Sequence, residues 1–197
     1  MKKHIRGSEK DTSTKKPTEW DKAWFSWPTE LQSEYITHRL LPLDEIDWRN
    51  TVLAATIPRS IGSLTNLKEL TLYHCKLTGC IPPELGLLVN LTALRLDDNS
   101  LSGPIPVQLG NLTNLIYLCL DKNYLIGCIP KELGRLVNLR LLNLKANAFS
   151  GPVPGELKEL EKLQMLYLNA AGIDPLIPLE IPVGSIVYNL LRSDGFR

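Results

Sequence analysis

Apolar residues in this chain return at fixed intervals rather than in one long run. An isoleucine or valine followed by proline recurs every 24 residues, at Ile57-Pro58, Ile81-Pro82, Ile105-Pro106, Ile129-Pro130, Val153-Pro154 and Ile177-Pro178. Five apolar positions return in the same phase, as Leu64, Leu67, Leu70, Leu72 and Leu77 in one unit and Leu88, Leu91, Leu94, Leu96 and Leu101 in the next. A fixed period of this length is typical of repeat architectures.

Each unit predicts one short strand. Leu70 and Leu72 are separated by a single residue, so their side chains point to one side of a strand and the residues beside them point to the other. A strand this short cannot bury its leucines alone. Successive units must therefore stack and pair their backbones, about 4.8 Å apart, into one continuous parallel sheet. The pattern predicts a solenoid.

Small and polar residues repeat with the leucines. One column follows each strand and places a side chain that can bond to backbone groups in the turn, at Cys75, Asn99, Asn123 and Asn147. Two glycine columns suit positive φ or close backbone approach, at Gly62, Gly86, Gly110 and Gly134 and at Gly79, Gly103, Gly127 and Gly151. The recurring P-x-x-L-G-x-L stretch predicts a short helical or 3₁₀ return.

The unit IPxELGxLxNLxxLxLxxNxLxG resembles the leucine-rich repeat of the plant-specific class, seen in receptor-like kinase ectodomains and polygalacturonase-inhibiting proteins. The resemblance covers residues 57–178. It implies an α/β repeat fold: a right-handed, curved solenoid with a parallel sheet on its concave face and short 3₁₀ or helical returns on its convex face. Protein recognition is the usual role of the family. The paired-cysteine caps of the family have no counterpart here.

The same phase divides the chain into four segments. A unit one period before the first full repeat is degenerate and carries its apolar residues at Leu40, Leu43, Ile46, Trp48 and Leu53. The segments are a disordered charged tail (1–19), an N-terminal cap with this degenerate repeat (20–56), five repeats (57–176) and a C-terminal cap (177–197). An aromatic cluster in the N-terminal cap either plugs the first repeat or anchors a partner, and consists of Trp20, Trp24, Phe25 and Trp27.

Composition narrows the class of partner. Twenty-two Lys and Arg against 21 Asp and Glu give a net charge of +1, which argues against a nucleic-acid partner. No apolar run is long enough for a membrane span, and the first twenty residues lack the apolar core of a secretory signal. These observations predict a cytoplasmic location. The tripeptides Asn90-Leu91-Thr92 and Asn111-Leu112-Thr113 match the glycosylation sequon, and in the cytosol they are by-products of the repeat.

The four cysteines form no CxxC pair, and we expect free thiols. Cys80 and Cys128 lie two repeats apart, about 9.5 Å by strand spacing, whereas a disulfide reaches about 7 Å. Cys119 lies one strand from Arg95, which favours a thiolate, but no histidine is in phase with it.

Residues beside the buried leucines on the concave face do not pack in the core, so we expect a partner to bind there. One column runs Glu69, Ala93, Tyr117, Leu141, Met165, and the next runs Thr71, Arg95, Cys119, Asn143, Tyr167. The following two run Tyr73, Asp97, Asp121, Lys145, Asn169 and His74, Asp98, Lys122, Ala146, Ala170. We predict that the partner contacts are Tyr73, Arg95, Asp97, Tyr117, Asp121 and Tyr167.

Catalysis is not expected. Asp97 and Asp121 lie about one strand apart, as in a retaining glycosidase, but on an open face with no pocket to raise one pKa. No metal site, cofactor or phosphate-binding loop is predicted. The sequence favours a monomeric, non-catalytic signalling module in the cytosol that binds a protein partner on its concave face. The alternative is a secreted, ligand-sensing ectodomain fragment of a receptor-like signalling protein with glycans on Asn90 and Asn111, or an extracellular enzyme inhibitor.

Overall fold

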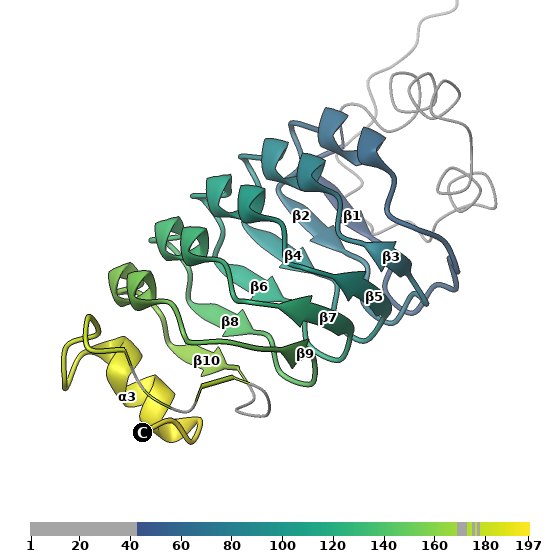
Figure 1. Ribbon diagram of the computed structural model, residues 1–197. Helices are drawn as coiled ribbons and strands as arrows, with labels where there is room; N and C mark the ends of the chain where they lie inside the picture. The colour runs from purple at the N-terminus through teal and green to yellow at the C-terminus, as the bar shows by residue number, and fades with distance from the viewer. Residues whose placement is uncertain (1–42, 169–172, 175, 177) are drawn as a thin grey trace, which may run out of the picture.

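The computed structural model describes residues 43–168, 173, 174, 176 and 178–197. The predicted disordered tail, the aromatic cluster and Leu40 lie outside the described residues. Successive repeats stack into a right-handed, curved α/β solenoid, as the sequence predicts (Figure 1).

The concave face is one parallel sheet. Among the described residues its strands, in spatial order, are β1 (Glu45–Asp47), β2 (Glu69–Thr71), β4 (Ala93–Arg95), β6 (Tyr117–Cys119), β8 (Leu141–Asn143) and β10 (Met165–Tyr167). Each residue pairs with the residue one period later, as Leu70 does with Leu94 and Leu94 with Leu118. Because β1 pairs with β2 in the same register, the degenerate unit also supplies a strand.

The core is a stack of leucines along the solenoid axis. The side chains of Leu70, Leu94, Leu118 and Leu142 are fully buried, and so are those of Leu72 and its counterparts in the next three repeats. Each strand thus buries its alternate residues against its neighbours, and no single unit has a core of its own.

A second parallel sheet follows the turns, and the sequence pattern did not predict it. Its strands, in order, are β3 (Thr78–Cys80), β5 (Ser100–Gly103), β7 (Tyr124–Gly127) and β9 (Ala148–Phe149). In β3, β5 and β7 a glycine of the second column adopts left-handed φ, for example +73° at Gly79 and +76° at Gly103. These strands lack the apolar alternation that identifies a strand in sequence.

The convex returns are 3₁₀ helices, as predicted. They are η2 (Arg59–Ser63), η3 (Pro83–Leu87), η4 (Val107–Asn111), η5 (Lys131–Arg135) and η6 (Gly155–Glu159), each preceded by a proline in extended conformation. Glycines of the first column allow close packing, since a Cβ on Gly62 would lie 2.8 Å from the carbonyl oxygen of Glu84 in the next return. In the last repeat Lys158 takes this position and is exposed, because no further 3₁₀ helix follows among the described residues.

Helix α3 (Ile186–Ser193) covers the C-terminal end of the stack (Figure 1). The hydroxyl of Ser185 accepts a hydrogen bond from the backbone of Tyr188 and caps its N-terminus. Val187 and Leu191 are buried, and Asp194 accepts a hydrogen bond from the backbone N–H of Leu168 at 2.7 Å. These contacts are those expected of a C-terminal cap, and its start at residue 177 stays a prediction. No helix in the described part of the chain has the length and apolarity to cross a membrane.

Candidate functional site

The turn after each concave strand is held by the polar column. Asn123 is buried, its Oδ1 accepts from the N–H of Leu101 at 2.9 Å, and its Nδ2 donates to the carbonyl oxygens of Leu96 and Leu120. Asn99 and Asn147 make corresponding bonds. Cys75 heads the column, and its thiol donates to the carbonyl oxygen of Trp48 at 3.0 Å. This ladder fixes where each strand ends and therefore where the concave side chains project.

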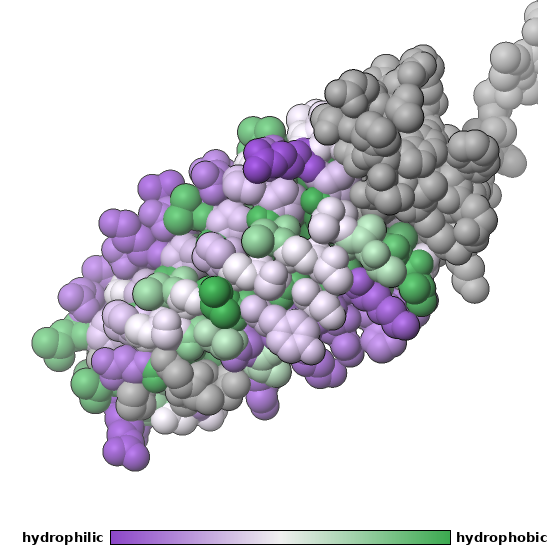
Figure 2. Space-filling view, turned by 45° about the vertical axis from the view of Figure 1, so that its right-hand side comes forward, coloured by the Kyte–Doolittle hydropathy of each residue, from purple (hydrophilic) through white to green (hydrophobic). Residues whose placement is uncertain are grey.

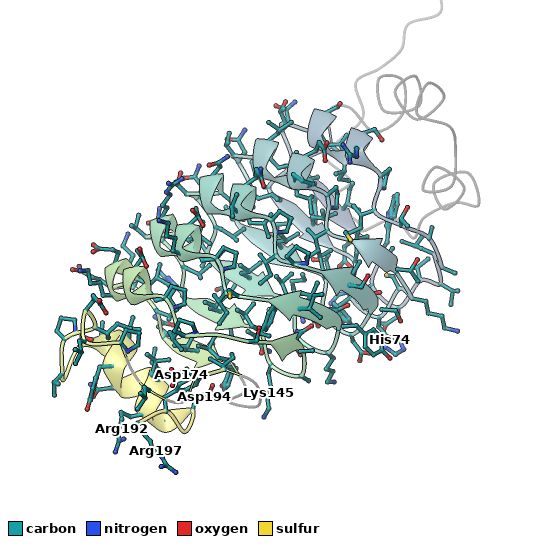
Figure 3. All side chains as sticks on the ribbon, viewed as in Figure 1. His74, Lys145, Asp174, Arg192, Asp194 and Arg197 are labelled. Atoms are coloured by element: carbon teal, nitrogen blue, oxygen red, sulfur yellow. The ribbon has the colours of Figure 1, made fainter. Side chains whose placement is uncertain are left out.

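The concave columns follow the strand register. Glu69, Ala93, Tyr117, Leu141 and Met165 pair in sequence across five strands, and so do Thr71, Arg95, Cys119, Asn143 and Tyr167. The third and fourth columns lie in the turns beyond the strands as far as residue 146, and Figure 3 shows His74 and Lys145 along one edge of the solenoid. Asn169 and Ala170, the last members of these columns, lie outside the described residues.

Three of the six predicted contact residues form one cluster on the N-terminal half of this face. The Arg95 guanidinium lies over the ring of Tyr73, with 4.6 Å between Cζ and the ring centroid, and pairs with a carboxylate oxygen of Asp97 at 3.5 Å. The Asp97 side chain is only 14% exposed. Arg95 and Asp97 therefore also contribute to the fold, unlike the free concave positions that the sequence analysis expected.

Asp121 adds a second carboxylate to this cluster. Burial raises the pKa of Asp121, and the neighbouring charge of Asp97 raises it further, whereas Lys122 and Arg95 lower it. The two carboxylates interact, and both are partly buried. Among the described residues, no group of three His, Cys, Asp or Glu side chains could hold a metal ion.

The expectation of a thiolate at Cys119 is wrong. Its side chain is 7% exposed, and burial raises the pKa of its thiol to about 11. Arg95 lowers this pKa, but the effect is smaller than that of burial. The sequence places the arginine correctly and does not show how deep the cysteine lies.

The other two predicted contacts belong to an apolar patch on the C-terminal half of the face. Tyr117, Leu141 and Met165 pair across neighbouring strands, and Tyr167 lies two residues beyond Met165. Tyr117 is 43% exposed, Met165 39% and Tyr167 40%. By strand register Tyr167 lies three strands from Arg95, about 14 Å away. The six predicted residues are therefore divided between a charged cluster and an apolar patch.

An acidic edge on β1 and β2 was missed by the sequence analysis. Glu45 and Glu69 pair directly in the same column as Tyr117. Burial and the charges of Glu69 and Asp47 raise the pKa of Glu45. Asp47 is paired with Arg49 at 2.8 Å. Extending the four columns back by one period would have found Glu45, Asp47 and Arg49.

Comparison with known proteins agrees with this geometry. The family model "Leucine Rich Repeat" matches residues 66–88 and 90–112. No curated protein sequence matches the chain. The ectodomain of the receptor kinase GASSHO1/SCHENGEN3 from Arabidopsis thaliana, solved with CASPARIAN STRIP INTEGRITY FACTOR 2, is 47% identical over 64% of this chain, with a TM-score of 0.62. The chain is a plant-type leucine-rich repeat protein.

Two further solved structures resemble this leucine-rich repeat protein. The Arabidopsis receptor kinase HAESA, in complex with the peptide hormone IDA and the co-receptor SERK1, is 32% identical over 71% of the chain, with a TM-score of 0.67. A plant ice-binding protein is 35% identical over 64% of the chain, with a TM-score of 0.57. The chain spans 15% of the GASSHO1/SCHENGEN3 structure, 24% of the HAESA structure and 40% of the ice-binding protein.

The predicted cytoplasmic location is contradicted by these comparisons. The solved structures similar to the repeats include ectodomains of plant membrane receptors, which are extracellular. The prediction depended on the composition of residues 1–20 and on the lack of a long apolar run, and neither carries weight against the resemblance of the repeats themselves.

Proposed function

We propose that this leucine-rich repeat protein acts outside the cell and binds an extended segment of a protein partner on its concave face. The apolar patch formed by Tyr117, Leu141, Met165 and Tyr167 carries the proposal. These side chains lie on a rigid sheet, so little conformational entropy is lost when a partner packs against them. The receptor ectodomains with peptide ligands support the same class of partner.

The apolar patch supplies most of the affinity. Tyrosine is enriched among the residues that dominate binding energies at protein interfaces. Its ring packs against apolar groups of a partner, and its hydroxyl can form a hydrogen bond. Covering exposed apolar surface contributes about 25 cal/mol per Å². A partner segment with two or three apolar side chains, spaced to cross neighbouring strands, matches this patch.

The acidic edge sets the orientation of the segment. Glu45 and Glu69 lie side by side and make the electrostatic potential here more negative. Burial raises the pKa of Glu45, and repulsion from the Glu69 carboxylate raises it further. A basic group on the partner would reduce the repulsion between these two carboxylates. The segment therefore places a basic residue over β1 and β2 and its apolar residues over β6 to β10.

The role is non-catalytic. Asp97 and Asp121 lie in the turns beyond β4 and β6, and Asp97 is already paired with Arg95. Within the wider protein, the chain acts as the ligand-sensing part of a receptor-like molecule. An extracellular enzyme inhibitor would use the same face with an enzyme as its partner.

The test compares tyrosines on the concave sheet with a control tyrosine on the second sheet. The biotinylated chain captures proteins from an extracellular extract of its source tissue, as wild type, as Tyr117→Ala with Tyr167→Ala, and as Tyr124→Ala. Tyr124 lies on the second sheet and is 66% exposed. A partner held by wild type and Tyr124→Ala but lost with the concave double variant supports the proposal. Equal recovery by the concave double variant contradicts it.

A second candidate function is ice binding by the second sheet. None of the four described strands of that sheet carries a charged residue, and Figure 2 shows a face with pale and green atoms in its middle and purple atoms along its margins. Charges hold water strongly and would disturb an ordered ice surface. The likeness to a plant ice-binding protein supports this candidate. Inhibition of ice recrystallisation that is lost in Thr78→Glu with Ser102→Glu would establish it, and no inhibition by wild type would exclude it.

A further inference from the structure

We propose that Asn111 is an N-glycosylation site and that Asn90, in an identical Asn-Leu-Thr tripeptide, remains largely unmodified. The inference rests on the extracellular location proposed above, where the sequon is meaningful. The same tripeptide occurs in two different environments of one chain. The surrounding structure, rather than the local sequence, therefore distinguishes them.

Asn111 is free to carry a glycan. It is the last residue of η4, it is exposed, and its side chain makes no hydrogen bond to any residue that the structure describes. Thr113, the third residue of the sequon, is exposed as well, and within the described part of the chain only its backbone is hydrogen-bonded. A sugar on the Asn111 amide therefore displaces no side-chain hydrogen bond to the described residues.

The other repeats show that this position has no packing requirement. The residues at the same phase are chemically unrelated and all exposed, namely Ser63, Leu87, Arg135 and Glu159. Side chains from serine to arginine fit here without a shared partner. A position that accepts this range of sizes has room for a glycan.

Asn90 belongs to a structural column on the convex side. Its Nδ2 donates to the carbonyl oxygen of Thr65 in the preceding repeat at 2.8 Å. The next repeats make the same contact, from Asn114 to Val89 at 3.0 Å and from Asn138 to Thr113 at 2.9 Å. A glycan on Asn90 would modify the nitrogen that makes this inter-repeat bond.

The threonine of this sequon is also engaged. Thr92 Oγ1 donates to the carbonyl oxygen of Lys68 at 3.1 Å, and Thr92 is partly buried. Both acceptors, on Thr65 and Lys68, precede Asn90 in the chain, so they are already synthesised when the sequon appears. Repeats fold onto their neighbours as they form. The hydrogen bonds of Asn90 and Thr92 therefore form in competition with binding of this sequon to the enzyme that transfers the glycan.

A glycan on Asn111 would leave both sheets accessible. It would project from the convex returns, where the neighbouring positions expose Leu87, Val89, Val107 and Val137. Sugar over these side chains would reduce apolar surface on the face that is not proposed to bind a partner. The modification would therefore favour docking on the concave face.

The test measures occupancy of each sequon by mass spectrometry of the full chain, secreted from a eukaryotic cell behind a cleavable signal. Enzymatic deglycosylation in heavy-oxygen water marks each modified asparagine. We expect Asn111 to be occupied in most molecules and Asn90 several-fold less. Asn111→Gln and Thr113→Ala should remove the main glycoform, whereas Asn90→Gln and Thr92→Ala should leave it. Equal occupancy of both sites, or an unmodified Asn111, would overturn the proposal.

The same measurement on the chain purified from its source tissue tests the Asn111 site and the extracellular location separately. A glycan on Asn111 in both samples supports both proposals. A glycan on the secreted chain alone would support the structural selection of Asn111 and contradict the extracellular location. If neither sample carries a glycan on Asn111, the site assignment is wrong, whatever the location.

Discussion

The Arg95 guanidinium covers the ring of Tyr73, one strand away, at 4.6 Å between Cζ and the ring centroid. A cation over an aromatic face contributes about 0.5–1 kcal/mol at an exposed site. Tyr73→Ala should therefore lower the free energy of unfolding by about 1 kcal/mol or less, and Tyr73→Phe by a smaller amount because the ring remains. Urea unfolding of the two variants measures the difference. An equal loss in both would mean that the ring makes no contribution.

The asparagine ladder predicts a larger loss. Asn123 is buried, accepts from Leu101 and donates to two strand ends. Asn123→Ala leaves these backbone groups without partners and should destabilise the fold by about 1–3 kcal/mol. Asn114→Ala is the matched control, since Asn114 is exposed and donates a single bond. Urea unfolding midpoints should separate the two variants, and equal midpoints would show that the ladder is not a principal stabilising element.

The four thiols should differ in reactivity. Burial raises the pKa of Cys75 and of Cys119 to about 11, whereas Cys80 and Cys128 are exposed. Since the thiolate is the nucleophile, iodoacetamide at pH 7.5 should label Cys80 and Cys128 quickly and the buried pair slowly. Mass spectrometry of a labelling time course measures this order. Rapid labelling of Cys119 would contradict its buried placement.

Asp121 should make the fold less stable as pH rises. Its folded pKa lies above the unfolded value because burial, and then Asp97, disfavour the carboxylate. The folded state therefore binds more protons than the unfolded state between these two pKa values, so stability falls as pH rises through that window and stays lower above it. Asp121→Asn should raise stability at pH 7 and flatten this part of the pH profile. A variant less stable than wild type at pH 7 would contradict this account.

The leucine period was sufficient to predict the strands of the concave sheet, because burial of Leu70 and its counterparts fixes both the strand face and the register. It was not sufficient for the second sheet. Strands such as β3 (Thr78–Cys80) contain a glycine with left-handed φ and have no apolar alternation, so their pairing depends on the stacking itself.

The candidate site was predicted in part for a similar reason. The position of each residue in the 24-residue period predicted the concave columns, but it did not predict how deeply each side chain is buried. The burial of Cys119 and the partly buried pair of Arg95 and Asp97 are therefore seen only in the structure. The acidic edge at Glu45 was missed because the degenerate repeat was treated as a cap rather than as part of the face.

The central claim is that the concave apolar patch binds the partner. It is tested most directly by titrating a captured partner against wild type, the double variant Tyr117→Ala with Tyr167→Ala, and the control Tyr124→Ala. We predict that the double variant raises the dissociation constant by about tenfold or more, equivalent to about 1.4 kcal/mol of binding free energy. The dissociation constant of the control should stay within about twofold of the wild-type value. Unchanged affinity in the double variant, or a loss confined to Tyr124→Ala, would contradict the claim.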